Sequence, residues 1–262
     1  MAMKMRESDV RPGRSRWPAW VLAPAVLAAA LAAASSRAGD DPKGQKEPKP
    51  LRVLFIGNSY TSANDLAGCV VKLGASAKPS VRIEVARHTP GGATLQQHWE
   101  KGEAVTKIRE GGWDYVVLQE GSLMPVINPQ CMHEYARKLD AEIKKAGAKT
   151  VFYMTWARRD KPEMTQVVAK AYTAIARELG AKVAPVGLAW AEAITQKGDL
   201  VLHRADKSHP NQQGTYLAAC TFYAALTGSD PRGLSDADLK EVTAEQAAFL
   251  QQVAWQSVRK AR

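Results

Sequence analysis

The sequence predicts an α/β protein in which a parallel β-sheet is covered by helices on both faces. Of its 262 residues, 45% are apolar and 24% are charged, which is ordinary usage for a globular protein and argues against a chain that is disordered throughout. Short apolar runs alternate with longer segments whose apolar residues recur at helical spacing. Because no second composition and no internal repeat interrupts this alternation, residues 51–262 are predicted to form one doubly wound domain.

The first part of this domain is expected to hold three strands and two helices. The largely apolar run at 51–56 ends at a glycine, which indicates a buried strand, and the spacing that follows predicts a helix over 62–77. Alternating β-branched residues indicate a second strand at 81–86. A helical pattern over 94–108 ends at a pair of glycines, and the third strand is expected at 114–119.

The second part continues the same alternation. A long helix is predicted over 129–146, because apolar side chains repeat along one of its faces. A strand at 150–155, a helix at 164–179 that a glycine closes, and a strand at 182–186 follow. The remaining helices are expected at 188–195, 211–226 and 243–259. In such sheets the functional site lies at the carboxyl ends of the strands, so the residues after each strand are the candidates.

The net charge of +10 does not indicate a nucleic-acid-binding surface. Residues 1–38 hold six basic and two acidic residues, and the other charges are spread along the chain without a basic block interleaved with aromatic residues. The phosphate-binding motifs GxxxxGK[ST] and GxGxxG are absent from the sequence. The sequence therefore predicts no nucleic-acid partner and offers no motif for nucleotide binding.

Residues 1–38 have the layout of a secretory signal peptide. Basic residues precede an alanine-rich apolar run at 20–34, and Ser36-Arg37-Ala38 fits a cleavage site. The run has 15 residues, whereas a membrane span needs about 20. The alternative is an uncleaved anchor helix, and both place the domain outside the cytoplasm, in the periplasm or the medium. Residues 39–50 are polar and proline-rich and are expected to form a disordered linker, with no stable membrane insertion once the signal is removed.

Glycines and reactive side chains stand at the strand ends. The segments concerned are Gly57-Asn58-Ser59 after the first strand, Gly91-Gly92 after the second, Gln119-Glu120 after the third, and Asp206 to His209 before the penultimate helix. Each segment alone has a simpler explanation, such as a helix cap for Ser59 or a turn for Gly92. Their combination is much more specific than any one of them.

Ser59, His209 and Asp206 are the residue types that nucleophilic catalysis requires. A serine hydroxyl is a weak nucleophile unless a base takes its proton, and histidine suits that role because its ordinary pKa is about 6.5. A carboxylate is needed to hold the imidazole in the correct tautomer. Asp206 and His209 are three residues apart, so one helical turn would place them on the same face. We therefore expect Ser59 as nucleophile, His209 as base and Asp206 as its orienting carboxylate.

The same chemistry requires donors for an oxyanion. The backbone N–H groups of Ser59 and Gly92 are expected to supply two, since a glycine lets the backbone approach the substrate closely. The side-chain amide of Gln119 is expected to supply a third. One donor of this kind contributes about 2.7–4 kcal/mol of transition-state stabilisation. The neighbouring Glu120 could contact the substrate or face solvent, and the solvent-facing position is the one expected.

These residues resemble the motif blocks of the SGNH (GDSL-type) hydrolases. Gly57-Asn58-Ser59 is similar to the nucleophile block, with Asn where Asp is commoner, Gly92 to the glycine of the second block, and Asp206-x-x-His209 to the last block. The third block departs from the pattern, because Gln119 stands in place of its usual Asn, which suggests a divergent branch. The resemblance covers most of residues 51–225. It implies a three-layer α/β/α sandwich with a flavodoxin-like five-stranded parallel sheet, and a serine esterase or lipase activity that uses no metal or other cofactor.

The function expected from this pattern is that of an exported esterase that cleaves a carboxylic ester through an acyl-enzyme on Ser59. The substrate would be a small-molecule or carbohydrate ester, and the habit of the family favours an O-acetyl group on a carbohydrate. The segment Trp156-Ala157-Arg158-Arg159 follows the fourth strand and could line the pocket. Its basic pair would suit an acidic or sugar-bearing substrate, although a solvated loop is the simpler expectation.

Two other functions stay open on the sequence alone. One is a non-catalytic carbohydrate-binding domain on the same fold. The other is a metal-dependent hydrolase that uses His203, Asp206 and His209, since His and Asp are good ligands for zinc or manganese. The sequence contains no H-E-x-x-H motif and no obvious fourth ligand. One disulfide could form in an exported protein, with the pairing undetermined among the three cysteines Cys69, Cys131 and Cys220.

Overall fold

The computed structural model describes residues 49–235 and 237–261. The predicted signal peptide, and all but the last two residues of the predicted linker, lie outside the described residues. Within the described part of the chain, none of the helices has the length and apolar character needed to cross a membrane.

A single parallel sheet has the strand order β2-β1-β3-β4-β5. Its strands are β1 (Leu51–Ile56), β2 (Ile83–His88), β3 (Tyr115–Leu118), β4 (Lys149–Tyr153) and β5 (Lys182–Ala184). In the middle of β1, Val53 is paired with Val85 of β2 on one side and with Tyr115 of β3 on the other. This is the flavodoxin-like order, so the predicted fold class is confirmed.

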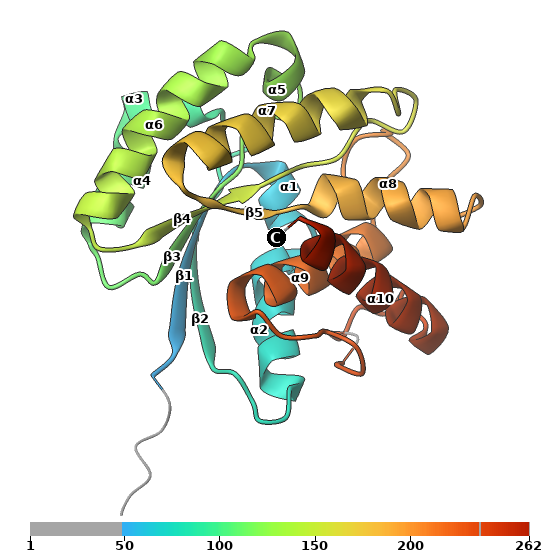
Figure 1. Ribbon diagram of the computed structural model, residues 1–262. Coiled ribbons are helices and arrows are strands. Elements are labelled where there is room, and N and C mark those ends of the chain that lie inside the picture. The colour runs from blue at the N-terminus through green and yellow to red at the C-terminus, as the bar shows by residue number, and fades with distance from the viewer. Residues whose placement is uncertain (1–48, 236, 262) are drawn as a thin grey trace, which may run out of the picture. The chain divides into compact units, whose positions relative to one another are not determined.

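Helices cover both faces of the sheet and give the protein three layers (Figure 1). On one side lie α2 (Leu66–Ser76), α8 (Val186–Gln196), α9 (Gln212–Thr227) and α10 (Ala244–Lys260). On the other side lie α3 (Leu95–Lys101), α4 (Glu103–Arg109), α6 (Pro129–Lys145) and α7 (Met164–Leu179). The helices predicted over 129–146, 164–179, 211–226 and 243–259 agree with these bounds to within one residue.

The sheet separates two apolar clusters. In β1, Val53 and Phe55 belong to one cluster, and Leu54 and Ile56 belong to the other. Both faces of the strand are therefore buried, which explains why most of its residues are apolar rather than alternating with polar ones. On the first side, α9 is buried at every residue from 214 to 226, because α2 and α10 enclose it. Such burial is the main source of stability for the layer.

Three local features differ from the sequence prediction. The predicted helix over 94–108 is two helices, α3 and α4, because Gly102 between them has a left-handed φ of 77°. The predicted helix over 62–77 begins later, at the start of α2; the short α1 (Ser59–Ser62) and the 3-10 turn η1 (Ala63–Asp65) precede it. One further helix, α5 (Met124–Ile127), is a single turn, too short for a periodic pattern to reveal.

The strand order reverses between β1 and β3. After β1 the chain crosses to β2 on one side, and after β2 it returns to β3 on the other. The crevice outside such a reversal, at the carboxyl ends of the strands, is where α/β sheets bind their ligands. The segments that follow β1, β2 and β3 all start from this edge of the sheet.

Candidate active site

Ser59 is the first residue of α1, close behind the end of β1. Asn58 is the N-cap of this helix, and its Oδ1 accepts a hydrogen bond from the backbone N–H of Tyr60 at 3.1 Å. The cap fixes the turn from strand to helix, because it satisfies a backbone donor that has no partner within the helix. Ser59 is thereby held at the sheet edge where the reversal of strand order occurs.

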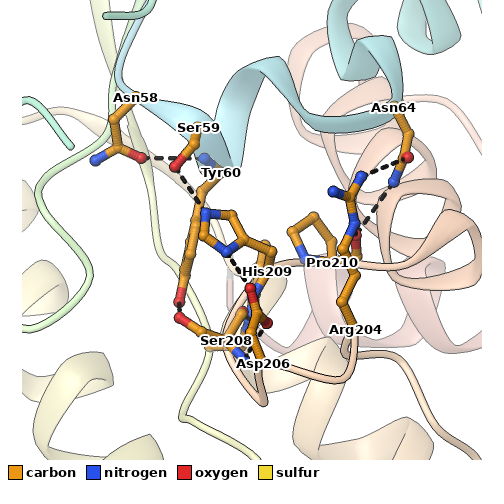
Figure 2. Close-up of polar contacts among 10 residues, drawn as sticks. Asn58, Ser59, Tyr60, Asn64, Arg204, Asp206, Ser208, His209 and Pro210 are labelled. Carbon is orange, nitrogen blue, oxygen red and sulfur yellow. Dashed lines mark hydrogen bonds and ion pairs between the residues drawn. The ribbon is translucent and has the colours of Figure 1, made fainter. Parts of the chain in front are cut away.

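The structure brings the three predicted catalytic side chains together (Figure 2). The Oγ of Ser59 lies 2.8 Å from the Nε2 of His209, and the Nδ1 of His209 lies 2.6 Å from the Oδ2 of Asp206. The side chains of His209 and Asp206 are 34% and 48% exposed, so the triad is open to solvent and to a substrate. This is the arrangement in which an imidazole takes a serine proton while a carboxylate holds its other nitrogen.

Asp206 also builds the turn that carries His209. Its Oδ1 accepts hydrogen bonds from the backbone N–H groups of Ser208 and His209, both at 2.9 Å. The turn contains Lys207 with a left-handed φ of 62°, so the expectation that a helical turn aligns Asp206 with His209 is wrong. The hydrogen bond from Ser208, together with those from His209, lowers the pKa of Asp206 to about 2. Asp206 is therefore ionised at neutral pH.

A pair of polar side chains ties this turn to the segment after the nucleophile (Figure 2). The Nη2 of Arg204 donates to the Oδ1 of Asn64 at 2.9 Å, and the Nδ2 of Asn64 donates to the carbonyl of Pro210 at 3.2 Å. Asn64 has a φ of 49°, a left-handed conformation that asparagine tolerates better than most residues. The two halves of the site are thus joined by hydrogen bonds other than the one between Ser59 and His209.

Tyr60 holds the base from another direction. Its hydroxyl lies 2.6 Å from the Oγ of Ser208, and its ring stacks on Trp156 with centroids 4.7 Å apart. The same ring meets His209 edge-on at 5.3 Å. The imidazole is therefore confined by Asp206 at one nitrogen and by an aromatic ring at its side. No motif singles out Tyr60, and its position directly after the nucleophile is the signal that could have identified it.

The backbone N–H groups of Ser59 and Gly92 are the two expected oxyanion donors. Within residues 49–235 and 237–261, neither the N–H of Ser59 nor that of Gly92 donates a hydrogen bond to the protein. Gly92 has a φ of 69°, a conformation that glycine adopts without strain. The Nδ2 of Asn58 donates to the carbonyl of Ala93 at 3.0 Å and so ties the Gly92 loop to the nucleophile turn.

The prediction that Gln119 supplies a third oxyanion donor is wrong. Its Nε2 donates to the carbonyl of Glu120, and its Oε1 accepts from the N–H of Asn58 at 2.9 Å and from the Oγ1 of Thr61 at 2.8 Å. Gln119 is fully buried, so all its hydrogen bonds serve the protein. Through Asn58 and Thr61, Gln119 stabilises the turn that carries the nucleophile. Sequence alone could not reveal this, because the partners lie about 60 positions away in the chain.

The same bracing explains the glycine before the nucleophile. A Cβ at Gly57 would lie 2.5 Å from the Oγ1 of Thr61 and 2.6 Å from the Oε1 of Gln119, so no side chain fits. The carbonyl of Gly57 lies 2.9 Å from the Nε2 of His98. Burial lowers the pKa of His98 to about 4, so its ring is neutral at physiological pH and can donate from Nε2.

Glu120 does not face solvent, contrary to the expectation. It is 1% exposed, and its Oε1 accepts hydrogen bonds from the backbone N–H groups of Leu95 and Gly121. Burial raises the pKa of Glu120 to about 7. The carboxyl group joins the loop after β3 to the first residue of α3, which directly follows the Gly92 loop. Glu120 therefore helps to hold the start of α3, and with it the Gly92 loop, in place.

The residues of the metal alternative do not converge on one point. The Nε2 of His203 lies 3.0 Å from the carbonyl of Ala157, and His203 is buried against Trp190. Among the residues that the structure describes, no group of three or more His, Cys, Asp or Glu side chains is arranged to hold a metal ion. The three cysteines Cys69, Cys131 and Cys220 are all free.

Comparisons with known proteins rest on structure. No family model matches the sequence, and no curated protein sequence matches it either. A protein from Slackia heliotrinireducens that is assigned to the SGNH hydrolases is 28% identical, with a TM-score of 0.59 over 68% of this chain and 100% of that one. A DUF4886 family protein from Bacteroides uniformis is 21% identical, with a TM-score of 0.67 over 80% of this chain and 95% of that one.

An enzyme of known substrate class is also similar in fold. A catalytic mutant of the acetylxylan esterase Axe2 from Geobacillus stearothermophilus is 19% identical, with a TM-score of 0.52 over 67% of this chain and 94% of that one. These likenesses show that the chain has an SGNH-type hydrolase fold. At the carboxyl ends of its strands, the described part of this chain carries a Ser–His–Asp arrangement and two backbone N–H groups, those of Ser59 and Gly92, that have no partner within it.

Proposed function

We propose that this chain, which has the fold of the SGNH hydrolases, is a serine esterase. Ser59 is the nucleophile, His209 the general base and Asp206 the carboxylate that orients the base. The backbone N–H groups of Ser59 and Gly92 form the oxyanion hole. The reaction is the hydrolysis of a carboxylic ester by way of an acyl-enzyme.

One observation carries this proposal. A continuous chain of hydrogen bonds runs from the Oγ of Ser59 through both ring nitrogens of His209 to Asp206, with lengths of 2.8 and 2.6 Å. A binding domain has no use for a serine hydroxyl hydrogen-bonded to an imidazole whose other nitrogen contacts a carboxylate. The contacts of the site therefore support catalysis over simple carbohydrate binding.

In the acylation step, the Oγ of Ser59 attacks the ester carbonyl carbon while its proton moves to the Nε2 of His209. The carbonyl oxygen becomes an oxyanion that the N–H groups of Ser59 and Gly92 receive. Ionised Asp206 stabilises the imidazolium that forms. When the bond between the carbonyl carbon and the alcohol oxygen breaks, His209 returns the proton to that oxygen and the alcohol leaves.

Deacylation repeats the sequence with water as the nucleophile. The Nε2 of His209, now unprotonated, takes a proton from a water molecule that attacks the acyl carbon. The same two backbone donors receive the second oxyanion. Collapse releases the carboxylic acid, and His209 gives its proton to the Oγ of Ser59, so the free enzyme is restored.

The substrate that we favour is an O-acetyl ester of a carbohydrate. The likeness to an acetylxylan esterase supports this class, although an identity of 19% carries the fold and not the specificity. The exposed position of His209 and Asp206 supports it as well, since a polymer-bound acetyl group must reach the base from solvent.

The test is the hydrolysis of nitrophenyl acetate and of acetylated sugars by the purified full chain. Ser59→Ala should lower kcat/KM by at least about a thousandfold, because the nucleophile is lost. Ser62→Ala, an exposed serine one turn further along α1, is the matched control and should retain activity. A metal chelator should leave the rate unchanged. Equal activity of the Ser59→Ala protein would overturn the proposal, and loss of activity with chelator would favour metal chemistry.

A further inference from the structure

Two adjacent hydrogen bonds connect the segment of the nucleophile with the segment that carries the base (Figure 2). The first joins the Oγ of Ser59 to the Nε2 of His209 at 2.8 Å. The second joins the residues next to them in the chain, since the hydroxyl of Tyr60 lies 2.6 Å from the Oγ of Ser208. The two segments are therefore linked once by reacting atoms and once by atoms that do not react.

Ser208 has a partner within the protein for each of its polar groups. Its N–H donates to the Oδ1 of Asp206 at 2.9 Å, and its carbonyl accepts from the Nε1 of Trp156 at 3.0 Å. Its Oγ contacts the hydroxyl of Tyr60. Ser208 is 7% exposed and Tyr60 is 3% exposed, so the bond between their hydroxyl groups is shielded from water. These contacts fix the residue that directly precedes the base.

Stacked rings fix the direction of the Tyr60 hydroxyl. The ring of Tyr60 lies parallel to Trp156 with centroids 4.7 Å apart, and Trp156 lies parallel to Trp190 with centroids 4.0 Å apart. None of the three residues is more than 3% exposed. The packing of Trp190 requires Gly214 of α9, where a Cβ would lie 2.4 Å from the indole ring. Because buried rings are closely packed, the Tyr60 hydroxyl stays directed at Ser208.

In the mechanism above, the first of the two bonds is lost when the acyl-enzyme forms. The Oγ of Ser59 then carries the acyl group in place of its proton, and the Nε2 of His209 has given its proton to the leaving alcohol. Both atoms are now acceptors, so they make no hydrogen bond to each other. The bond between Tyr60 and Ser208 contains no reacting atom, so the chemistry leaves it intact.

We propose that the hydrogen bond between Tyr60 and Ser208 keeps His209 in place in the acyl-enzyme, where the imidazole must activate water. Tyr60 and Ser208 are thus positioning residues for deacylation. A general base must lie within hydrogen-bond reach of the proton that it takes, and a displacement of about 1 Å can cost about a hundredfold in rate. Arg204 and Asn64 also join the two segments, but neither adjoins Ser59 or His209 in sequence. This inference rests on the proposed esterase function and adds which step the two hydroxyl groups control.

Burst kinetics with nitrophenyl acetate measure the two steps separately. Nitrophenolate is a good leaving group, so the first turnover reports acylation and the steady rate that follows reports deacylation. Tyr60→Phe keeps the stacked ring and Ser208→Ala keeps the backbone bonds, and each removes the hydrogen bond between the two residues. Each variant should lower the deacylation rate constant by about 10- to 100-fold and the acylation rate constant by less than about threefold.

This split has a signature that a general loss of structure would not produce. The kcat and KM of each variant should fall together, while kcat/KM, which reports acylation, stays near the wild-type value. Intact-mass spectrometry should show acetylated protein accumulating during turnover. A protein that is merely less well folded would instead lose kcat/KM and accumulate no acyl-enzyme.

A double variant and a distant control complete the test. Tyr60→Phe combined with Ser208→Ala should slow deacylation no more than either change alone, because both remove the same bond. Tyr135→Phe removes a hydroxyl that donates to Glu100 of α3, away from the triad, and should leave both rate constants unchanged. Circular dichroism checks the fold of each variant, and Ser208→Ala decides the question if the tyrosine variant does not fold.

An unchanged deacylation rate in a folded single variant would overturn this inference while leaving the esterase proposal intact. Equal losses in the two rate constants, or additive losses in the double variant, would overturn it as well. Failure of the wild type to form an acetyl-enzyme that depends on Ser59 would instead overturn the proposed function itself.

Discussion

Asn58 and Ala93 join the two loops that carry the free backbone donors of the site. The Nδ2 of Asn58 donates to the carbonyl of Ala93 at 3.0 Å, while its Oδ1 caps the helix that begins with Ser59. One side chain thus sets both the nucleophile turn and the position of Gly92. An aspartate in this place could still cap the helix, but it has no hydrogen to give to a carbonyl oxygen.

We therefore expect Asn58→Asp to lower kcat by about ten- to a hundredfold with little change in KM, since a donor is misplaced only in the transition state. The melting temperature should stay close to that of the wild type, because the cap is retained. Asn58→Ala should lose the cap as well and cost about 1 kcal/mol of stability. Steady-state kinetics and thermal unfolding of both variants check this. An aspartate variant with unchanged kcat would show that the bond to Ala93 does not position Gly92.

Asp206→Asn should lower kcat by about 10³–10⁴-fold without unfolding the turn. The asparagine Oδ1 can still accept from the N–H groups of Ser208 and His209, as the Oδ1 of Asp206 does. Its amide, however, donates toward Nδ1 of His209, so the ring must carry its proton on Nε2 and cannot take one from Ser59. Kinetics and a circular dichroism spectrum measure the two effects separately. Turnover at the wild-type rate would remove Asp206 from the mechanism.

Glu120→Gln should change how stability depends on pH. The pKa of Glu120 is raised from 4.5 to about 7 by burial, so the folded state retains a proton that the unfolded state releases over this range. The wild-type protein therefore loses stability as pH rises from about 4.5 to about 7, by an amount on the order of 3 kcal/mol. The glutamine of the variant cannot ionise, and its side-chain carbonyl can accept from Leu95 and Gly121 in the same way.

Unfolding in urea at pH 5 and at pH 8 tests this expectation. The Glu120→Gln variant should gain stability relative to the wild type on going to pH 8. Burial raises the pKa of Tyr172 and of Cys131, and the charge of Glu120 adds to both shifts. The variant leaves both residues in place. Glu110→Gln, at an exposed position after α4, is the control and should show no such gain. A difference between variant and wild type that is the same at both pH values would contradict the buried ionisation.

The sequence predicted the fold well where periodicity is strong. The strand Leu51–Ile56 and the helix Met164–Leu179 have the bounds that the pattern predicts, because both bury apolar side chains in long regular arrays. The pattern failed at Gly102, where a left-handed glycine breaks a helix whose apolar spacing continues across it. Periodicity indicates which face of a helix is buried, but it does not reveal where the backbone changes direction.

The site was predictable as a set of residue types and not as a set of contacts. Ser59, Asp206 and His209 meet as expected, since each has one chemical role that its position at a strand end or before a helix allows. Gln119 and Glu120 were misplaced, because an amide or a carboxyl can serve either a ligand or a distant backbone group. Whether such a side chain binds a ligand or a backbone group depends on which distant segments the fold places next to it.

The parallel direction of all five strands gives the molecule two unlike edges. The nucleophile turn and the Gly92 loop leave the sheet at the carboxyl edge, and the segment between α8 and α9 brings His209 to the same place, whereas each loop that enters a strand lies at the amino edge. The exposed turn at Gly147, between α6 and β4, is such an entrance. Turns of this kind can lengthen, accept a tag or be joined to another domain without reaching the triad. The protein can therefore be displayed or immobilised through one edge while the other remains free to work.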